Sequence, residues 1–307
     1  MKHPVHVLGS AGLILCALAL AARGQVLVND TWRDGTRTDP ASPTYSEFGT
    51  DADSDGDIES AWIAANRSTN FIAAVGSLTF YPTAGTSRAG LTYFTPAASP
   101  VTLSDGQALK VTLTFTPSGV AATSSATTTR FAIADYTGGT RLTADGTSSS
   151  MNGTGVKGYA LFLNVANTFG VPPLSLRERT TLSSDLLGVA SDWTTLGSGG
   201  GLAGDPGFTD GISYTMVLTL ARNSGTLDFT AAITGGSLNI SHSVTDTSPS
   251  TFTFDAFALR AANSTDTPTM QFTNFKVEIV PEPTALSLLG VAGLGLLAGR
   301  QLLRRRA

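Results

Sequence analysis

The chain has 307 residues, of which 19 are lysine or arginine and 23 are aspartate or glutamate, giving a formal net charge of −4. Two apolar end segments hold six of the basic and one of the acidic residues, so residues 25–280 are more acidic than the whole. Because an acidic surface repels phosphate backbones, nucleic acid is not expected as a partner. The single cysteine, Cys16, lies in the first end segment, and residues 25–280 contain one histidine, His242. Their composition therefore excludes thiol catalysis, disulfides and multi-histidine metal sites.

The first segment, residues 1–24, has the parts of a secretory signal peptide. Lys2 supplies a positive start, and residues 7–22 are nearly all apolar. Ala22 and Gly24 place small residues at the positions that a signal peptidase reads before Gln25. A short transmembrane anchor is the alternative interpretation. We expect residues 1–24 to direct export and to be removed.

The last segment, residues 281–307, joins three parts in order. A proline-containing tripeptide is followed by an apolar run, residues 284–299, and then by basic residues at the end of the chain. The residues that define the outer two parts are Pro281, Glu282 and Pro283, then Arg304, Arg305 and Arg306. An apolar helix of this length nearly spans a bilayer, and the basic cluster should stay on its cytoplasmic side.

This order of parts resembles the PEP-CTERM sorting signal, and the resemblance is confined to the tail. It implies recognition by an exosortase, a membrane-embedded cysteine protease-transpeptidase, and removal or exchange of the tail near Pro281–Pro283. It also implies a bacterium that makes exopolysaccharide. A permanent single-pass anchor is the alternative, and both interpretations place residues 25–280 outside the cytoplasm.

Residues 25–280 repeatedly alternate apolar and polar side chains. In residues 110–116, Val111, Leu113 and Phe115 fall on one face and hydroxyl-bearing residues on the other. The pattern recurs in seven further segments, which are 130–136, 158–165, 213–220, 226–233, 237–244, 251–259 and 271–279. Such alternation, with glycine-containing turns between the segments, predicts half-buried antiparallel strands, roughly a dozen in all.

That many strands in one domain predict two packed sheets. The pattern resembles a concanavalin A-like jelly roll, in which an opening strand, here residues 26–32, pairs with a closing strand, here residues 272–279. We therefore expect an all-β, two-sheet jelly-roll sandwich over residues 25–280, flanked by the signal peptide and by the transmembrane sorting helix. The glycine-rich stretch at 197–207 is expected to be a mobile loop.

Residues 51–59 carry the sharpest local signal. Alternate carboxylates followed by Gly56 match the first half of an EF-hand-type calcium loop, with Asp51, Asp53, Asp55 and Asp57 as candidate ligands. The twelfth position of such a loop, normally a bidentate glutamate, is Trp62, so Glu59 or a distant carboxylate would have to replace it. A weak calcium site and a solvated acidic loop are the two interpretations, and no other cofactor is expected.

A catalytic site is harder to find. Glycoside hydrolysis commonly uses two carboxylates about 5–9 Å apart, and residues 25–280 contain only four glutamates. Glu178 is the one weak catalytic candidate, although the charged stretch around it, residues 176–180, is better interpreted as an exposed cross-strand ladder of ion pairs. Trp32, Trp62 and Trp193 could stack on sugars, but tryptophans more often belong to a core. Asp30, two residues before Trp32, is expected to be a structural capping group.

The sequence thus predicts an exported, exosortase-processed protein of the cell surface or extracellular matrix. We expect it to be non-catalytic, with the capacity to bind a glycan such as exopolysaccharide, and to be held at the inner membrane before its tail is processed. The alternatives are a glycan-active lyase or hydrolase on the same jelly roll and a purely structural protein of the matrix.

Overall fold

The computed structural model describes residues 24–65, 68–82, 88–146, 151–261 and 268–281. This part of the chain is almost wholly β, as predicted, and its only helical segments are the 3-10 turns η1 (Ser68–Asn70) and η2 (Ala190–Asp192). The expected signal peptide and the tail beyond Pro281 lie outside the described residues. No helix within the described ranges has the length and apolar character needed to span a membrane.

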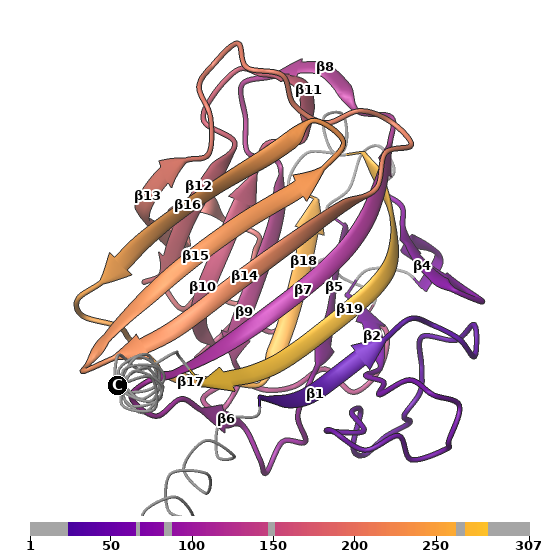
Figure 1. The fold of residues 1–307 in the computed structure, drawn as a ribbon. Coiled ribbons are helices and arrows are strands. Elements are labelled where there is room, and N and C mark those ends of the chain that lie inside the picture. The colour runs from indigo at the N-terminus through magenta and orange to yellow at the C-terminus, as the bar shows by residue number, and fades with distance from the viewer. Residues whose placement is uncertain (1–23, 66–67, 83–87, 147–150, 262–267, 282–307) are drawn as a thin grey trace, which may run out of the picture.

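The predicted two-sheet sandwich is confirmed (Figure 1). One sheet has eight strands, in the spatial order β16 (Leu238–Asp246), β15 (Thr226–Gly235), β14 (Tyr214–Asn223), β7 (Gln107–Ser118), β19 (Thr269–Pro281), β4 (Ser77–Phe80) and β3 (Phe71–Ala74), with β1 (Gln25–Asp30) also on β19. The other has seven, in the order β13 (Trp193–Gly199), β12 (Leu174–Arg179), β10 (Lys157–Leu163), β9 (Thr129–Asp135), β18 (Ala256–Ala261), β5 (Arg88–Tyr93) and β2 (Trp62–Ala64).

Two small pairs of strands complete the described part. β11 (Ala166–Phe169) runs parallel to β8 (Ala121–Ser124), and β17 (Thr253–Phe254) pairs with β6 (Val101–Thr102). The stretch 251–259, predicted as one strand, is thus divided between β17 and β18. The short strands β2 to β6 account for much of the excess over the predicted dozen, because strands of two to six residues carry little periodic signal.

The alternating strands behave as their sequence predicts. Val111, Leu113 and Phe115 of β7 are fully buried between the two sheets, and the intervening residues face outward. The first and last strands also pair as expected, with β1 antiparallel to β19. β19 lies inside the eight-stranded sheet, between β7 on one side and β4 and β1 on the other, and its pairing with β1 brings the two ends of the domain together (Figure 1).

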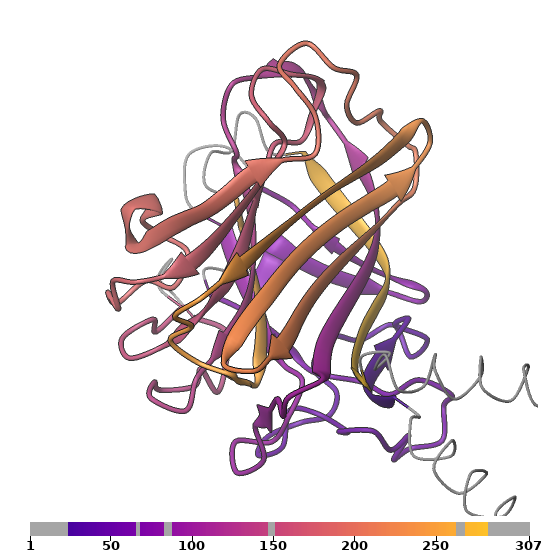
Figure 2. The ribbon, with the colours of Figure 1, turned by 60° about the vertical axis from the view of Figure 1, so that its left-hand side comes forward.

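The seven-stranded sheet differs because its middle strands are buried on both faces. Every residue of β5, β9 and β18 is buried, including alternate small residues such as Ala132 and Ala258 on the face turned away from the eight-stranded sheet, where Ala160 of β10 also lies. The loops before β10 and before β13 lie over this outer face, where Met151, Val156 and Leu186 contact the small side chains. Figure 2 shows these loops outside the sandwich, on the side of the seven-stranded sheet.

The glycine-rich stretch departs from its prediction at its start. Gly197 and Gly199 belong to β13, which pairs with β12, rather than to a loop. These positions have no room for a side chain, since a Cβ on Gly199 would lie 2.5 Å from Nδ1 of His242 on β16. The missing side chains let the edge strands of the two sheets approach one another along one side of the sandwich.

Candidate functional site

The outer face of the seven-stranded sheet carries a pocket of about 380 Å³, which we call the arginine pocket. Its volume falls in the range of small-ligand sites. It is lined by side chains of four strands, of η2 and of two connecting segments, namely Ser125, Ala126, Thr127, Arg130, Phe162, Val171, Pro172, Ser175, Arg177, Ala190 and Ser198.

Strand register builds the floor of this pocket. Arg130 on β9 stands opposite Phe162 on β10, which stands opposite Ser175 on β12, and Ser175 stands opposite Ser198 on β13. Directly opposed residues share a face of a sheet, so these four side chains form one row across four strands. Arg177 lies two residues beyond Ser175 and therefore on the same face.

Two arginines enclose the phenyl ring in this row. The guanidinium carbon of Arg177 lies 4.3 Å from the centroid of the Phe162 ring, and that of Arg130 lies 4.5 Å from it. Arg130 donates from Nη1 to the backbone oxygen of Leu187 at 2.6 Å, and Arg177 donates from Nε to Oγ of Ser175 at 3.0 Å. Stacking and hydrogen bonds therefore hold both guanidiniums in place.

The pocket is positively charged. No aspartate or glutamate lines it, and neither arginine forms an ion pair with another described residue. Burial, together with the positive charges of Arg260 and Arg177, lowers the pKa of Arg130 to about 10. Burial also lowers the pKa of Arg177. Burial is the largest cause of both shifts, and for Arg130 the charge of Asp185, which is itself paired with Arg260, acts weakly in the opposite direction.

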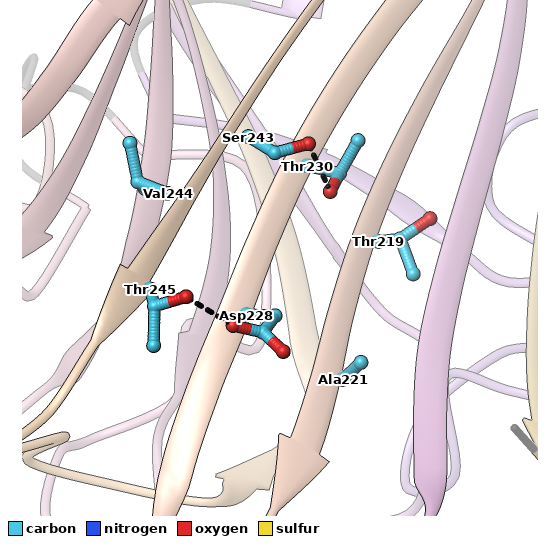
Figure 3. A pocket seen from close by; sticks show the side chains of 7 residues that line it. All are labelled: Thr219, Ala221, Asp228, Thr230, Ser243, Val244 and Thr245. Atoms are coloured by element: carbon cyan, nitrogen blue, oxygen red, sulfur yellow. Dashed lines mark hydrogen bonds between the residues drawn. The ribbon is translucent and has the colours of Figure 1, made fainter.

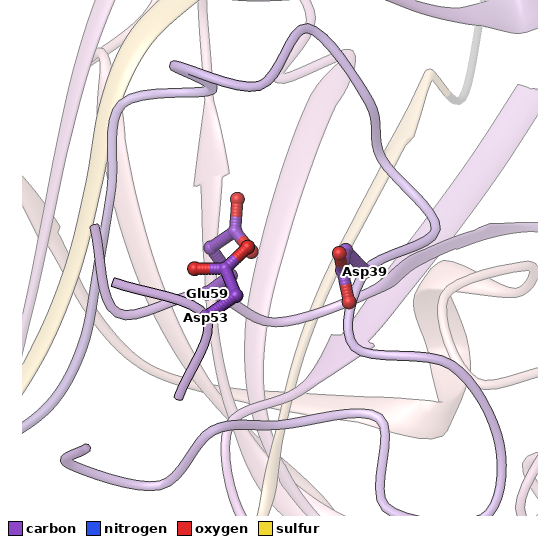
Figure 4. Close-up of side chains that lie close together, drawn as sticks. All are labelled: Asp39, Asp53 and Glu59. Atoms are coloured by element: carbon purple, nitrogen blue, oxygen red, sulfur yellow. The ribbon is translucent and has the colours of Figure 1, made fainter. Parts of the chain in front are cut away.

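A group of three carboxylates forms a second candidate site, for a cation. Asp39, Asp53 and Glu59 each offer an oxygen, and these oxygens lie within 4.8 Å of one another (Figure 4). Calcium binds oxygens at 2.3–2.6 Å, so oxygens up to about 5 Å apart can share one ion. Figure 4 shows Glu59 and Asp53 on one side of the group and Asp39 opposite them.

Glu59 is the buried member of this group, whereas Asp39 and Asp53 are exposed. It is 3 % exposed, and no hydrogen bond reaches its carboxylate from the part of the chain that the structure describes. Burial and the surrounding charges, chiefly that of Asp34, raise its pKa to about 8. A cation beside these oxygens would remove the repulsion, so the three residues fit a calcium ion.

The four ligands predicted from the sequence are distributed differently. Asp53 belongs to the group just described, and also to a second one with Glu47 and Asp51. Asp51 and Asp55 accept hydrogen bonds from backbone N–H groups of their own loop. Asp57 points elsewhere, because its carboxylate accepts hydrogen bonds from Thr31 and from the backbone N–H of Arg33. Asp39 could not be found from the loop pattern, since it lies well before the loop in sequence.

The interpretation of residues 176–180 as an exposed ladder of ion pairs is wrong. Arg179 is buried and donates to the backbone oxygens of Gly153, Val156 and Ser183, so it fastens loops to the sheet. Glu178 faces the inter-sheet side, where it accepts a hydrogen bond from the backbone N–H of Ser250 at 2.8 Å. It thus lies on the opposite face of the sheet from the arginine pocket.

The tryptophans and Asp30 have structural roles. Trp32, Trp62 and Trp193 are buried, so their rings are not presented to a ligand. Asp30 accepts a hydrogen bond from the backbone N–H of Trp32 at 2.7 Å, which agrees with the predicted capping role.

A third concave surface lies on the eight-stranded sheet, with a volume of about 400 Å³ (Figure 3). Thr219 and Ala221 of β14, Asp228 and Thr230 of β15, and residues 243–245 of β16 line it. Its polar groups largely satisfy one another, since Thr230 bonds to Ser243 at 2.8 Å and Thr245 donates to Asp228. It therefore offers a ligand fewer free polar groups than the arginine pocket does.

The sequence matches no family model and no curated protein. Solved structures with a similar fold include the metal-free carbohydrate recognition domain of Emp46p, 13 % identical, with a TM-score of 0.42 over 72 % of this chain and 88 % of that one. Lectin II from Ulex europaeus is 12 % identical, with a TM-score of 0.41 over 71 % and 92 %. The CBM2 module of the evolved Dit protein of Lactobacillus casei BL23 phage J-1 is 12 % identical, with a TM-score of 0.42 over 85 % and 97 %. These likenesses are too distant to carry a functional argument.

Proposed function

We propose that this chain is an exported, non-catalytic protein of the cell surface or extracellular matrix that binds a glycan on a concanavalin A-like jelly roll. The observation that carries the proposal is the arginine pocket. Fixed guanidinium and hydroxyl groups line a small-ligand-sized hollow on the outside of the domain. Sugars are recognised through such convergent polar groups, because each hydroxyl of a sugar can both donate and accept hydrogen bonds.

Binding without catalysis follows from the lining. Hydrolysis of a glycosidic bond commonly uses a pair of carboxylates close to the bond that breaks, and no carboxylate lines the arginine pocket. Glu178, the one candidate, is buried on the other face and is engaged with Ser250. These facts favour a binding protein over the alternative of a lyase or hydrolase.

The proposal includes a calcium ion held by Asp39, Asp53 and Glu59. These residues join two separate parts of the long segment between β1 and β2. An ion there would stabilise this segment against the sandwich by linkage, since binding favours the folded state.

Export and tail processing are also part of the proposal. Their support is the signal-peptide pattern of residues 1–24 and the PEP-CTERM-like order of residues 281–307. An exosortase would process the tail at the inner membrane and release the domain to the surface or matrix. Mass spectrometry of surface-exposed protein tests this step. Material that still carries Arg304, Arg305 and Arg306 would show a simple anchor instead.

A glycan array tests the binding function. Protein recovered after export is applied with calcium and, in parallel, with a chelator. We expect one class of saccharide to bind, and we expect an Arg177→Gln variant to bind it more weakly. Absence of binding to every saccharide, with the protein folded and calcium present, would contradict the proposed function.

A further inference from the structure

We propose that the arginine pocket takes the anionic group of an acidic saccharide, a carboxylate or a sulfate carried on a hydroxyl-rich sugar chain. This inference rests on the proposed function and names the class of glycan that the same site binds. Three properties of the pocket carry it, namely unpaired charge, fixed geometry and the kind of groups at its rim.

Unpaired charge distinguishes these two arginines from four others in the domain; Arg179 also forms no ion pair with a described residue, but it is fully buried, donates to three backbone oxygens and does not line the pocket. Arg37, Arg141, Arg222 and Arg260 each form an ion pair with an aspartate at 2.5–3.0 Å. Arg130 and Arg177 form none with any described residue, although both are at least half-buried. Removing a charge from water without a counter-charge is costly, so an anion in this pocket would gain what the neighbouring arginines gain from aspartate.

Fixed geometry makes the two charges usable. Phe162 lies between the guanidiniums, and backbone oxygens of Leu187 and Gly188 accept from Nη1 of Arg130 at 2.6 and 3.3 Å. The buried Nε of Arg130 has no acceptor among the described residues. A planar guanidinium presents parallel donors that match the oxygens of a carboxylate or sulfate. Because both side chains are already ordered, binding an anion costs little side-chain entropy.

The rim indicates a saccharide as the carrier of the anion. Ser125, Thr127 and Ser198 surround the arginines and offer hydroxyl groups to a polyhydroxylated chain. The one aromatic ring of the pocket, Phe162, is 1 % exposed and is covered by the guanidiniums, so no face is free for a nucleobase to stack on.

Three dextrans that share one backbone test this inference. Unmodified dextran, carboxymethyl-dextran and dextran sulfate are titrated against the immobilised, exported protein by biolayer interferometry. We expect both charged dextrans to bind at least about tenfold more tightly than dextran, a difference of about 1.4 kcal/mol. We also expect this preference to decline as salt rises, because the contact is between charges. The tighter of the two charged probes identifies the anion as carboxylate or sulfate.

Variants tie the preference to the pocket. Arg177→Gln should remove most of it, and Arg177→Lys should retain part of it because the charge remains. The matched control is Arg222→Gln, since Arg222 also lies over a phenyl ring, that of Phe252 at 4.2 Å, but is paired with Asp105. If Arg177→Gln unfolds, Arg177→Lys and the salt series still report on the charge.

Three results would overturn the inference. Charged dextrans that bind no more tightly than dextran, in a protein that binds neutral glycans on the array, would refute the anionic ligand and leave the proposed function standing. If the charged dextrans bind wild type and Arg177→Gln equally tightly, they contact a surface other than the arginine pocket. Failure of every saccharide, neutral or charged, to bind would refute the proposed function as well.

Discussion

The carboxylate of Asp145 lies 2.6 Å from the guanidinium of Arg37, 108 residues earlier in the chain. The same carboxylate accepts a hydrogen bond from the backbone N–H of Ala64, and Arg37 donates to the backbone oxygens of Trp62 and Phe71. This network fastens the long segment between β1 and β2 to the edge of the seven-stranded sheet. The acidic group of Asp39, Asp53 and Glu59 is built on that segment.

Asp145→Ala should lower the free energy of unfolding by about 2 kcal/mol, because it removes the acceptor of several charge-assisted hydrogen bonds. Urea unfolding measures the change. Asp105→Ala is the matched control, since the pair of Asp105 with Arg222 is exposed and should contribute less than about 1 kcal/mol. Equal losses in the two variants would show that Asp145 does not fasten the segment.

Calcium should raise the melting temperature of the wild-type protein through linkage. At a tenfold excess over the dissociation constant, binding adds about 1.4 kcal/mol to the free energy of unfolding. Asp39→Asn and Glu59→Gln should abolish this shift in a thermal melt. Asp105→Asn, which removes a remote exposed carboxylate, should not. If Asp51→Asn abolishes the shift and Asp39→Asn does not, the ion is held by the linear loop and not by the assembled group.

Asp30→Asn should stabilise the protein increasingly as pH rises. Burial and the charges of Asp57, Asp34 and Asp55 raise the pKa of Asp30 from 3.8 to about 8, against the effect of the hydrogen bond from Trp32. For such a raised pKa, the contribution to stability is complete below pH 3.8 and is lost as pH rises through about 8.

Asparagine keeps the acceptor for Trp32 and cannot ionise. The advantage of Asp30→Asn over wild type should therefore widen between pH 4 and 8, by at most about 1.4 kcal/mol per unit. Urea unfolding at several pH values, with chelator present throughout, measures it. An advantage that does not change with pH would show that Asp30 is not protonated in the folded protein.

Gly90→Ala should destabilise the domain by about 1–3 kcal/mol through overpacking. A Cβ at Gly90 would lie 2.3 Å from Cζ of Phe71. That ring is 2 % exposed and is packed against Trp62 and Phe80, so it has little room to move. The double variant Gly90→Ala/Phe71→Leu should recover part of the loss, and additive losses would contradict the clash.

Glu178→Gln should leave saccharide binding unchanged, because the side chain lies on the face opposite the arginine pocket. It should lower stability by about 1–2 kcal/mol, since the hydrogen bond from Ser250 then reaches a neutral acceptor. Dissociation constants for the best array ligand and urea midpoints measure the two effects. If Glu178→Gln loses saccharide binding while its free energy of unfolding is unchanged, Glu178 is part of the binding site.

The sequence by itself determined the architecture of the alternating strands. A period of two residues is a local property, so Val111, Leu113 and Phe115 identify both a strand and its buried face before any partner is known. The resemblance to a concanavalin A-like jelly roll implied that the first and last strands pair, and they do. The sequence did not predict that β9 and β18 are buried on both faces, because alternation identifies one apolar face and does not show that loops cover the other.

Only the tertiary structure decided where the candidate sites lie. Arg130, Phe162, Ser175 and Ser198 come from four strands, and they form one row because of strand order and register, which depend on contacts between distant parts of the chain. Asp39 meets Glu59 because the segment between them folds back across the sheet edge. A shift of one residue in register would turn every side chain of a strand to the other face, so local patterns cannot specify such groupings.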